Sequence, residues 1–334
     1  MLAMVLDHNA DVVTSPLKLR ELSEPAPGAG EVRLKVNCCA VCRTDLHVIE
    51  GELPPARLPV IPGHQFVGVV DELGSDITRF AKGDRVGVAW LRNTCGQCEY
   101  CRAGRENLCE SSRYTGYHAD GGYATSAVVP ADYAYAIPPG LTDTQAAPLL
   151  CSGIIGYAAL RRSNLRDGGS IALYGFGSSA HIVLQVAKHR GCTVYVVTRA
   201  AEHRQLARDM GAHWVGENPS DLPAKTDSAI LFAPVGTLVP PAMEHLKKGG
   251  TLAVAGIYLS PVPELDYSRH LFYERDLRSV TANTRSDGEG LLAEAAAIPI
   301  HPHVTTYPLA RANEALIDLK SDRINGTAVL LMEA

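Results

Sequence analysis

Short apolar runs bounded by Gly, Pro or Asp dominate the chain up to about residue 150. Runs of this length and composition, separated by turn-forming residues, are typical of β-strands. We therefore expect a β-rich region whose strands lie within residues 31–41, 60–74, 83–90 and 121–130.

A different pattern begins after residue 150. Apolar stretches that predict buried strands alternate with segments that show one apolar helical face. Strands that alternate with helices in this way predict an α/β fold with a doubly wound parallel sheet. The C-terminal region adds one more helix and one more strand. The predicted strands are residues 170–175, 193–198, 227–234, 251–256 and 327–332, and the predicted helices are residues 180–191, 202–212, 242–250 and 310–320.

The longest uncharged stretch, residues 144–160, approaches the length of a membrane span. Gln145, Pro148, Ser152 and two glycines interrupt it, so we expect a buried helix and no membrane association. The N-terminal apolar run ends at Asp7, before the apolar core that a signal peptide needs. We therefore expect a cytoplasmic protein.

Length and charge narrow the class of protein. The 334 residues are enough for two domains, and 46% of them are hydrophobic, which excludes disordered and collagen-like chains. The 36 acidic residues outnumber the 31 basic ones, and this balance argues against nucleic acid as a partner. In a reducing cytoplasm, nine cysteines are better explained by metal ligation, catalysis or burial than by disulfides.

Four of the cysteines, Cys95, Cys98, Cys101 and Cys109, fall within one short segment, TCGQCEYCRAGRENLC. Gaps of two residues let successive thiolates converge on one ion, and the longer gap returns the chain for the fourth corner of a tetrahedron. We interpret the segment as a closed structural zinc site whose metal stabilises an irregular loop. Free surface thiols, an iron–sulfur cluster and a zinc-ribbon nucleic-acid module are the alternatives, and the acidic balance disfavours the last.

Three further fragments carry candidate metal ligands: VCRTDLHVIEG contains Cys42, VIPGHQFVGVV contains His64 and PLLCSGIIGY contains Cys151. Together with the four-cysteine segment they resemble the zinc-dependent medium-chain alcohol dehydrogenases, and the resemblance extends over nearly the whole chain. It implies a Rossmann cofactor-binding domain and a GroES-like β-rich catalytic domain. The implied ranges are residues 150–284 for the first, and residues 1–149 and 285–334 for the second.

The resemblance assigns Cys42, His64 and Cys151 to a catalytic zinc and the four clustered cysteines to a structural zinc, which makes two zinc ions per subunit. Two thiolates and an imidazole offset the zinc charge and leave one position for a substrate oxygen. The other cysteines are expected to be buried small hydrophobes. They are Cys38, Cys39 and Cys192.

Residues close to Cys42 match positions that handle protons in the family. The resemblance implies that Thr44 takes the alcohol proton and that His47 passes it to solvent through the cofactor ribose. A helix cap and a surface histidine are the alternative roles of these two residues. Asp45 is expected to orient the His64 ring as a hydrogen-bond acceptor.

Two positions depart from the family pattern. The family usually reads Gly-His-Glu where this chain has Gly-His-Gln, and we hypothesise that the neutral Gln65 leaves the zinc more electrophilic. Ile155 stands where relatives often carry Thr, and it suggests an apolar wall against the nicotinamide. Trp90 and Leu91 match substrate-pocket positions, although Trp90 is equally well explained as a core aromatic residue.

A nucleotide-binding loop is predicted where a strand pattern passes into a helix pattern. The segment YGFGSSAH places Gly175, Gly177 and Ala180 in a G-x-G-x-x-A arrangement, which suits a pyrophosphate at a helix N-terminus. The hydroxyls of Ser178 and Ser179 can add donors to the phosphate. An ordinary tight turn between strand and helix is the alternative.

The residues after the next strand bear on the choice of cofactor. NAD-specific sites place Asp or Glu there to bind the ribose hydroxyls, whereas this chain has Thr198 and Arg199. Arg199, with Arg204 nearby, can pair with a 2′-phosphate, so NADP(H) is the first choice and NAD(H) the alternative. The resemblance adds Arg43 as a contact of the cofactor pyrophosphate.

These observations predict a zinc-dependent alcohol dehydrogenase or aldehyde (carbonyl) reductase, which transfers a hydride between a nicotinamide cofactor and a small alcohol or carbonyl compound. A medium-chain quinone or enone reductase without catalytic zinc is the main alternative, and a non-enzymatic zinc-binding protein is a second. Relatives form homodimers or homotetramers, and one of these states is expected here.

Overall fold

The computed structural model describes residues 1–53, 57–298 and 300–332. Within it the chain forms two units. Among the described residues, none of the helices has the length and hydropathy that crossing a membrane requires. Unit 1 comprises Met1–Cys151, Ala282–Ala297 and His301–Ala334, and unit 2 comprises Ser152–Thr281 and Ile298–Ile300.

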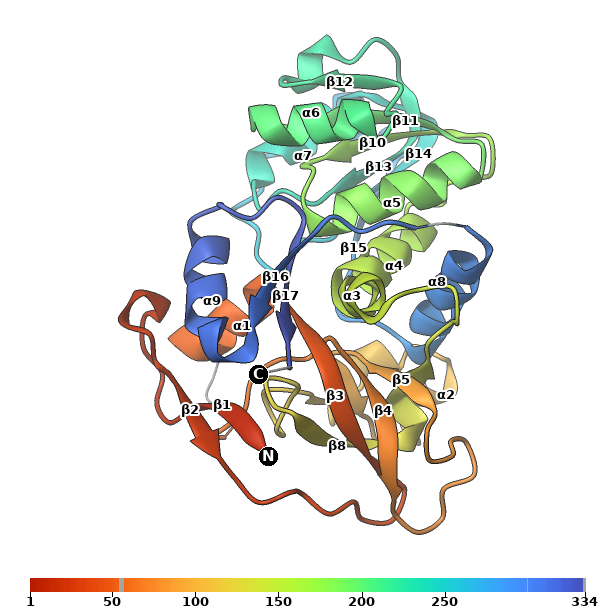
Figure 1. Cartoon of the computed structure of the whole chain (residues 1–334). Coiled ribbons are helices and arrows are strands. Elements are labelled where there is room, and N and C mark those ends of the chain that lie inside the picture. The colour runs from red at the N-terminus through yellow and green to blue at the C-terminus, as the bar shows by residue number, and fades with distance from the viewer. Residues whose placement is uncertain (54–56, 299, 333–334) are drawn as a thin grey trace. The chain divides into compact units, whose positions relative to one another are not determined.

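Unit 2 is built on a six-stranded sheet in the order β12-β11-β10-β13-β14-β15, and every neighbouring pair of strands is parallel. Helices connect the strands and flank the sheet (Figure 1). This is the doubly wound Rossmann arrangement that the sequence predicts. The strands are β10 (Ser170–Tyr174), β11 (Thr193–Val197), β12 (Trp214–Gly216), β13 (Thr226–Leu231), β14 (Leu246–Val254) and β15 (Asp276–Ser279), and the helices are α4 (Ile154–Arg162), α5 (Ser178–His189), α6 (Ala201–Asp209) and α7 (Val239–Glu244).

Strand β10 is buried along almost its whole length. Ala172 and Tyr174 belong to one apolar cluster with Val239, Ala242 and Met243 of α7. A parallel strand that is covered on both faces needs an apolar residue at nearly every position. This explains why the segment SIALY reads as a continuous apolar run and not as an alternating one.

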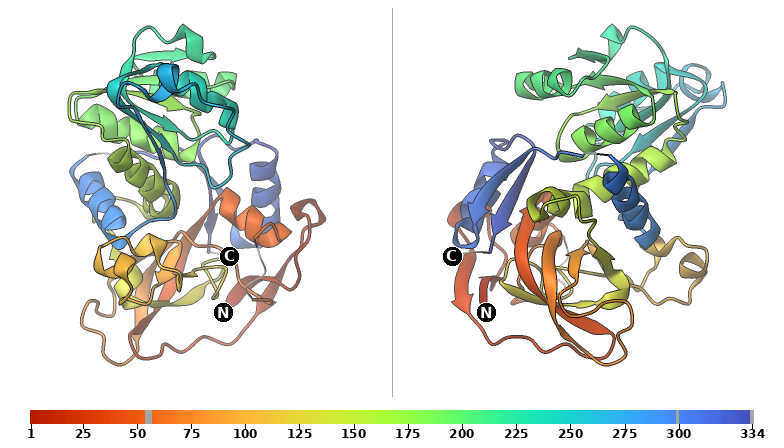
Figure 2. Two further views of the ribbon diagram at one scale, coloured as in Figure 1. Left: turned by 180° about the vertical axis from the view of Figure 1, so that it is seen from behind. Right: turned by 45° about the vertical axis from the view of Figure 1, so that its right-hand side comes forward.

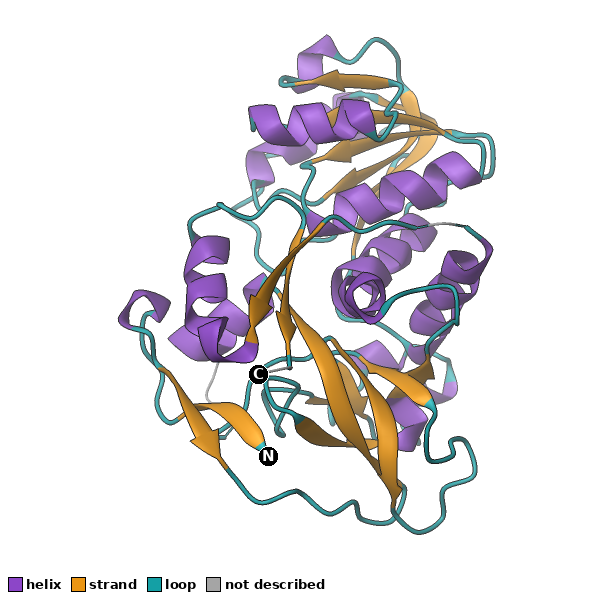
Figure 3. Ribbon diagram, viewed as in Figure 1, coloured by secondary structure: helices purple, strands orange, loops and turns teal. Residues whose placement is uncertain are grey.

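Unit 1 contains a seven-stranded mixed sheet, in which β16, β17, β3, β4, β5 and β9 follow one another and β8 pairs with β3. The long antiparallel strands β3 (Glu31–Val41) and β4 (Phe66–Leu73) are seen from two further directions in Figure 2. Long loops join many of the strands (Figure 3). The other strands are β1 (Leu2–Leu6), β2 (Leu17–Glu21), β5 (Arg85–Val88), β6 (Leu91–Asn93), β7 (Arg113–Tyr114), β8 (Ser126–Pro130), β9 (Ala134–Ala136), β16 (Val304–Pro308) and β17 (Thr327–Leu331).

Helices of unit 1 lie between these strands in the sequence. Two predictions are confirmed: the region up to about residue 150 is rich in β-strands, and the C-terminal region adds a helix and a strand. The core of the unit gathers apolar side chains from β1, β3, β4, β8 and the C-terminal helix α9. The helices are α1 (Arg43–Glu50), α2 (Glu99–Arg102), α3 (Asp143–Pro148), α8 (Arg285–Ala297) and α9 (Ala312–Lys320).

Several predicted elements are wrong in their extent; the strand expected over residues 121–130, for example, starts only at Ser126. The helix expected over residues 242–250 ends at Glu244, and β14 starts at Leu246, because Gly249 and Gly250 are poor helix formers and this stretch pairs with β13. The strand expected over residues 60–74 starts only at Phe66. Pro62 lacks an N–H for the sheet, and Gly63 has a φ of +92°, so these residues turn the chain before the strand.

Candidate active site

Cys42, His64 and Cys151 come together in unit 1, with their ligand atoms all within 4.8 Å of one another. Cys42 Sγ lies 3.3 Å from His64 Nε2 and 3.9 Å from Cys151 Sγ, and His64 Nε2 lies 3.4 Å from Cys151 Sγ. Zinc bonds of about 2.3 Å to sulfur and 2.0–2.1 Å to nitrogen, arranged tetrahedrally, put such atoms roughly 3.6–3.8 Å apart. The three residues therefore have the spacing and the chemistry of a three-ligand zinc site.

The local backbone explains where Cys42 stands. It is the N-cap of α1, where its Sγ accepts a hydrogen bond from Thr44 N at 3.3 Å. Asp45 closes the capping box, because its carboxylate accepts from Cys42 N at 2.9 Å. Residues 42–45 thus supply one candidate metal ligand, the Cys42 thiol, and their hydrogen bonds hold it in position.

Cys151 lies in a π-helical segment, Leu149–Gly153, between α3 and α4. The buried helix expected over residues 144–160 is therefore confirmed, but it contains an irregular π-helical turn that the sequence did not predict. Pro148 has no backbone N–H to donate, so regular α-helical bonding is interrupted at this point. Single π-turns inside helices often mark functional sites, because they re-aim one side chain.

The side chains around the three ligands favour a cation. The pKa of the Cys42 thiol lies well below its usual range, chiefly because Cys151 donates a hydrogen bond to it, and the pKa of Cys151 is raised by the same bond. Burial lowers the pKa of His64, but the Asp45 carboxylate and the Cys42 thiolate outweigh burial and raise it to about 10. A metal ion held by Cys42, His64 and Cys151 would supply positive charge here and would favour both thiolates.

The Asp45 side chain is only 2% exposed, and its carboxylate accepts three hydrogen bonds from neighbouring residues. Besides Cys42 N, it accepts from His64 Nδ1 at 2.9 Å and from the Tyr123 hydroxyl at 3.1 Å. Burial raises the pKa of Asp45, while its contact with His64 lowers it. Tyr123 was not among the predicted site residues, because its segment, GGYATS, predicts only a strand.

Gln65 is fully buried, and neither its Nε2 nor its Oε1 finds a hydrogen-bond partner among the described residues. A buried amide without partners is costly, by about 1–3 kcal/mol for each group left unpaired. Gln65 directly follows the candidate ligand His64 in the sequence.

Thr44 and His47 lie three residues apart on α1, which puts both side chains on one side of the helix. Both are partly exposed. The His47 Nδ1 contacts the Glu52 carboxylate just beyond the end of the helix. Arg43, in the same helix, is exposed and pairs with Asp322.

An aromatic cluster stands beside His64. The Trp90 ring meets the His64 ring edge-on at 4.9 Å between centroids, and Tyr114 and Tyr117 stack on Trp90 at 4.8 and 5.9 Å. His118 extends the cluster from Tyr117 at 4.5 Å. Tyr114, Tyr117 and His118 were not among the predicted site residues. The aromatic-rich segment RYTGYH, which contains all three, could have indicated this cluster. Leu91 begins β6 and is only 1% exposed.

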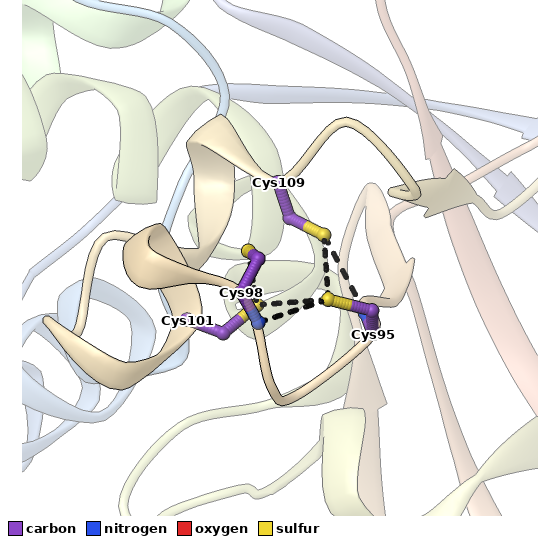
Figure 4. A group of neighbouring side chains, drawn as sticks. All are labelled: Cys95, Cys98, Cys101 and Cys109. Carbon is purple, nitrogen blue, oxygen red and sulfur yellow. Dashed lines mark hydrogen bonds between the residues drawn. The ribbon is translucent and has the colours of Figure 1, made fainter.

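The four clustered cysteines form a second metal-ligand group on one loop of unit 1 (Figure 4). Cys109 Sγ lies 3.5 Å from Cys95 Sγ, and Cys101 Sγ lies 3.5 Å from Cys98 Sγ and 3.9 Å from Cys95 Sγ. Sulfurs around one tetrahedral zinc ion stand about 3.8 Å apart. Backbone N–H groups of Gln97 and Cys98 lower the pKa of Cys95 to about 6, which favours the thiolate. These residues fit a closed, four-thiolate zinc site.

The predicted nucleotide loop lies in unit 2 between β10 and α5. Gly175 has a φ of +91°, and a Cβ there would stand 2.9 Å from Ala233 N, so only glycine suits the turn. Gly177 caps α5, and Ser178, Ser179 and Ala180 form its first turn. The Ser178 hydroxyl donates to the Ser152 hydroxyl at 2.7 Å.

Past β11, Thr198 is buried and Arg199 is exposed. Among the described residues, no carboxylate pairs with Arg199. Arg204 is instead engaged, because it donates to Thr198 O at 3.1 Å and pairs with Glu217 at 3.3 Å. Ile155, in α4, is partly buried.

Comparison with known proteins shows which families of domain the chain resembles. The model of the alcohol dehydrogenase GroES-like domain matches residues 28–139, and that of the zinc-binding dehydrogenase matches residues 179–297. The thermostable alcohol dehydrogenase of Pyrobaculum aerophilum has a similar solved structure, with a TM-score of 0.87 and 29% identity over 99% of each chain.

Sequence relatives narrow the class. A protein of Mycobacterium tuberculosis named "Probable alcohol dehydrogenase AdhA" is 52% identical over 96% of this chain and 94% of its own length. An alcohol dehydrogenase of Geobacillus stearothermophilus is 37% identical over 95% of this chain and 96% of its own. The chain therefore belongs to the zinc-dependent medium-chain alcohol dehydrogenase family, and the predicted enzyme class, an NAD(P)-dependent oxidoreductase acting on CH–OH groups, is confirmed.

Proposed function

We propose that this enzyme is a zinc-dependent alcohol dehydrogenase or aldehyde reductase of the cytoplasm, with a catalytic zinc on Cys42, His64 and Cys151 and a structural zinc on the four clustered cysteines. Unit 1 is the catalytic domain and unit 2 binds the cofactor. The convergence of two cysteines and a histidine from three distant segments carries the proposal. All nine cysteines are free thiols, which fits a reducing compartment.

Zinc, when bound, acts as a Lewis acid that makes an alcohol more acidic and a carbonyl more electrophilic. The residues of α1 then handle the proton. The Thr44 hydroxyl, in the first turn after Cys42, both accepts and donates hydrogen bonds and receives the proton of the alcohol. Thr44 gives up its own hydroxyl proton in turn, which reaches His47, one turn further along the same face, through the cofactor ribose, and His47 passes it to solvent. Glu52 holds Nδ1 of His47, which leaves Nε2 as the accepting atom.

Two measurements test the proposal together. Metal analysis of the purified enzyme is expected to give two zinc ions per chain, and a spectrophotometric screen of alcohols and aldehydes with NAD(H) and NADP(H) is expected to show activity. One zinc per chain with activity on enones only identifies the zinc-free reductase instead. Two zinc ions without activity on any primary or secondary alcohol or carbonyl compound overturns the assignment.

NADP(H) is the proposed cofactor, because Arg199 is exposed and pairs with no carboxylate of the described residues, whereas Arg204 pairs with Glu217. Replacing Arg199 by glutamine is expected to lower kcat/KM for NADPH about 10- to 100-fold and to leave kcat/KM for NADH almost unchanged. A charge-assisted hydrogen bond to a phosphate contributes roughly 1.5–3 kcal/mol, which accounts for this loss. Arg208→Gln, which replaces an exposed arginine of α6, the helix that follows Arg199, is the control. A wild-type enzyme that strongly prefers NADH contradicts the proposal.

Gln65 is proposed to keep the metal centre more electrophilic than a glutamate would. The Gln65→Glu variant adds a negative charge next to His64, so the ionisation that activates the alcohol is expected to move to higher pH. The pH dependence of kcat/KM for alcohol oxidation measures the shift. Gln65→Met, uncharged and of similar size, is the control. Superimposable profiles of wild type and Gln65→Glu refute the hypothesis.

The proposed substrates are small alcohols and aldehydes with apolar alkyl or aryl groups, because Trp90 and its stacked tyrosines provide apolar surface beside His64. A homodimer or homotetramer is proposed as well. Exposed apolar side chains, among them Tyr258, Tyr267 and Phe272, lie close in sequence to β15, the edge strand of the unit 2 sheet. Light scattering that gives the mass of one chain contradicts this.

A further inference from the structure

We infer that Tyr123 is a positioning residue of the catalytic metal centre, acting on His64 through Asp45. The Tyr123 hydroxyl donates to Asp45 Oδ2 at 3.1 Å, and Asp45 Oδ1 lies 2.9 Å from His64 Nδ1. All three side chains are at most 2% exposed, so water does not substitute for these bonds. The inference rests on the proposed function, in that His64 Nε2 is taken as a metal ligand.

Backbone contacts bring Tyr123 to this position. The segment Gly121–Tyr123 lies along the turn Ile61–Gly63 that precedes His64. Gly121 N donates to Ile61 O at 2.7 Å, Gly122 N to Gly63 O at 2.8 Å and Tyr123 N to Pro62 O at 3.0 Å. Three backbone hydrogen bonds therefore hold the segment that carries Tyr123 against the turn that precedes His64.

Two glycines make this close approach possible. A Cβ on Gly63 would stand 2.3 Å from the Tyr123 ring, and a Cβ on Gly121 would stand 1.9 Å from Gly63 O. Both distances are far below van der Waals contact. Tyr123 thus packs against the peptide that immediately precedes His64, and its ring and its hydroxyl constrain the same ligand from two directions.

The carboxylate of Asp45 links two of the three metal ligands. Oδ2 accepts from Cys42 N as well as from Tyr123, and Oδ1 faces His64. Without the hydroxyl, one lone pair of a buried carboxylate is unpaired and the carboxylate is less firmly held. Groups that orient a metal-binding histidine typically change metal affinity by about 10- to 100-fold when they are altered.

The test is metal affinity at the catalytic site of the full-length enzyme. Tyr123→Phe removes only the hydroxyl and keeps the ring against Gly63. We expect zinc to be released to a chelator at about tenfold lower chelator concentration, and the visible spectrum of the cobalt-substituted catalytic site to change. The four-cysteine site provides the internal reference, and its affinity is expected to stay constant.

Tyr307→Phe is the matched control, because the Tyr307 hydroxyl also donates to an aspartate, Asp318, at 2.8 Å in the same unit. It removes the same kind of bond away from the metal ligands, and zinc affinity is expected to remain that of the wild type.

A double-mutant cycle with Asp45→Asn tests the route. If Tyr123 acts through Asp45, Tyr123→Phe lowers zinc affinity little further in an enzyme that already carries Asp45→Asn. Additive losses, or a Tyr123→Phe variant with wild-type affinity and cobalt spectrum, overturn the inference while the proposed function stands. A wild-type enzyme that holds zinc only at the four cysteines overturns both, and this is seen before any variant is compared.

Discussion

Replacing Cys151 by alanine is expected to lower kcat/KM for alcohol oxidation by about 10⁴-fold or more and to reduce the zinc content from two ions to one. Cys42 and His64 alone leave the ion with two protein ligands, too few for stable binding at a catalytic site. Lewis-acid activation contributes several kcal/mol to such reactions, and about 1.4 kcal/mol corresponds to each tenfold in rate. Alanine is a strong helix former, so the helical backbone around position 151 is expected to remain.

Steady-state kinetics and metal analysis on the same preparation measure the two effects. Cys38→Ala is the control, since Cys38 is also a buried cysteine of unit 1 but belongs to neither metal-ligand group. It is expected to keep both zinc ions and nearly full activity. A Cys151→Ala enzyme that retains two zinc ions, or that loses less than tenfold in kcat/KM, contradicts the proposed ligand set.

Local pattern was enough to predict most elements, because strands and helices depend on short-range periodicity. β3 and β10 were predicted almost to the residue: β3 alternates polar and apolar residues before an apolar end, and β10 is a nearly continuous apolar run. The same signal was insufficient at residues 144–160, where a proline and the requirements of packing produce a π-helical segment within an apolar stretch. Periodicity reports whether a stretch is buried, and it does not report how its backbone hydrogen bonds are paired.

In the candidate site, too, local sequence pattern predicts some features and not others. The four cysteines are close in sequence, so their spacing alone indicates a common ion. Cys42, His64 and Cys151 are far apart, and only the resemblance to a family connected them. Their supporting contacts depend on tertiary structure.

Tyr123 illustrates such a contact. It reaches Asp45 because a loop docks on the His64 turn, and no spacing rule connects residues 45 and 123. The pairing of Arg204 with Glu217 is equally absent from the sequence pattern, because the two residues are brought together by the fold of unit 2.

The second large effect is expected at the four-cysteine site. Replacing Cys109 by serine is expected to remove the structural zinc and to lower the Tm of the enzyme by about 10 °C. The loop has little apolar burial of its own, since Cys95 is exposed and Cys98 and Cys101 are only partly buried, so the metal supplies most of its order. Zinc present at 1,000 times its Kd stabilises the folded state by about 4 kcal/mol. For a domain of this size, each kcal/mol corresponds to about 2–4 °C in Tm.

The loss spreads beyond the loop because the loop is tied to the rest of unit 1. Glu106 accepts three hydrogen bonds from Arg285, from its backbone N at 2.8 Å and its side chain at 2.9 and 2.9 Å, and so joins the loop to α8. Thermal melting with parallel zinc analysis measures the effect. Cys192→Ser, a buried cysteine of unit 2 outside both metal-ligand groups, is the control and is expected to keep two zinc ions. A Cys109→Ser enzyme with two zinc ions and an unchanged Tm shows that the loop orders itself without the metal.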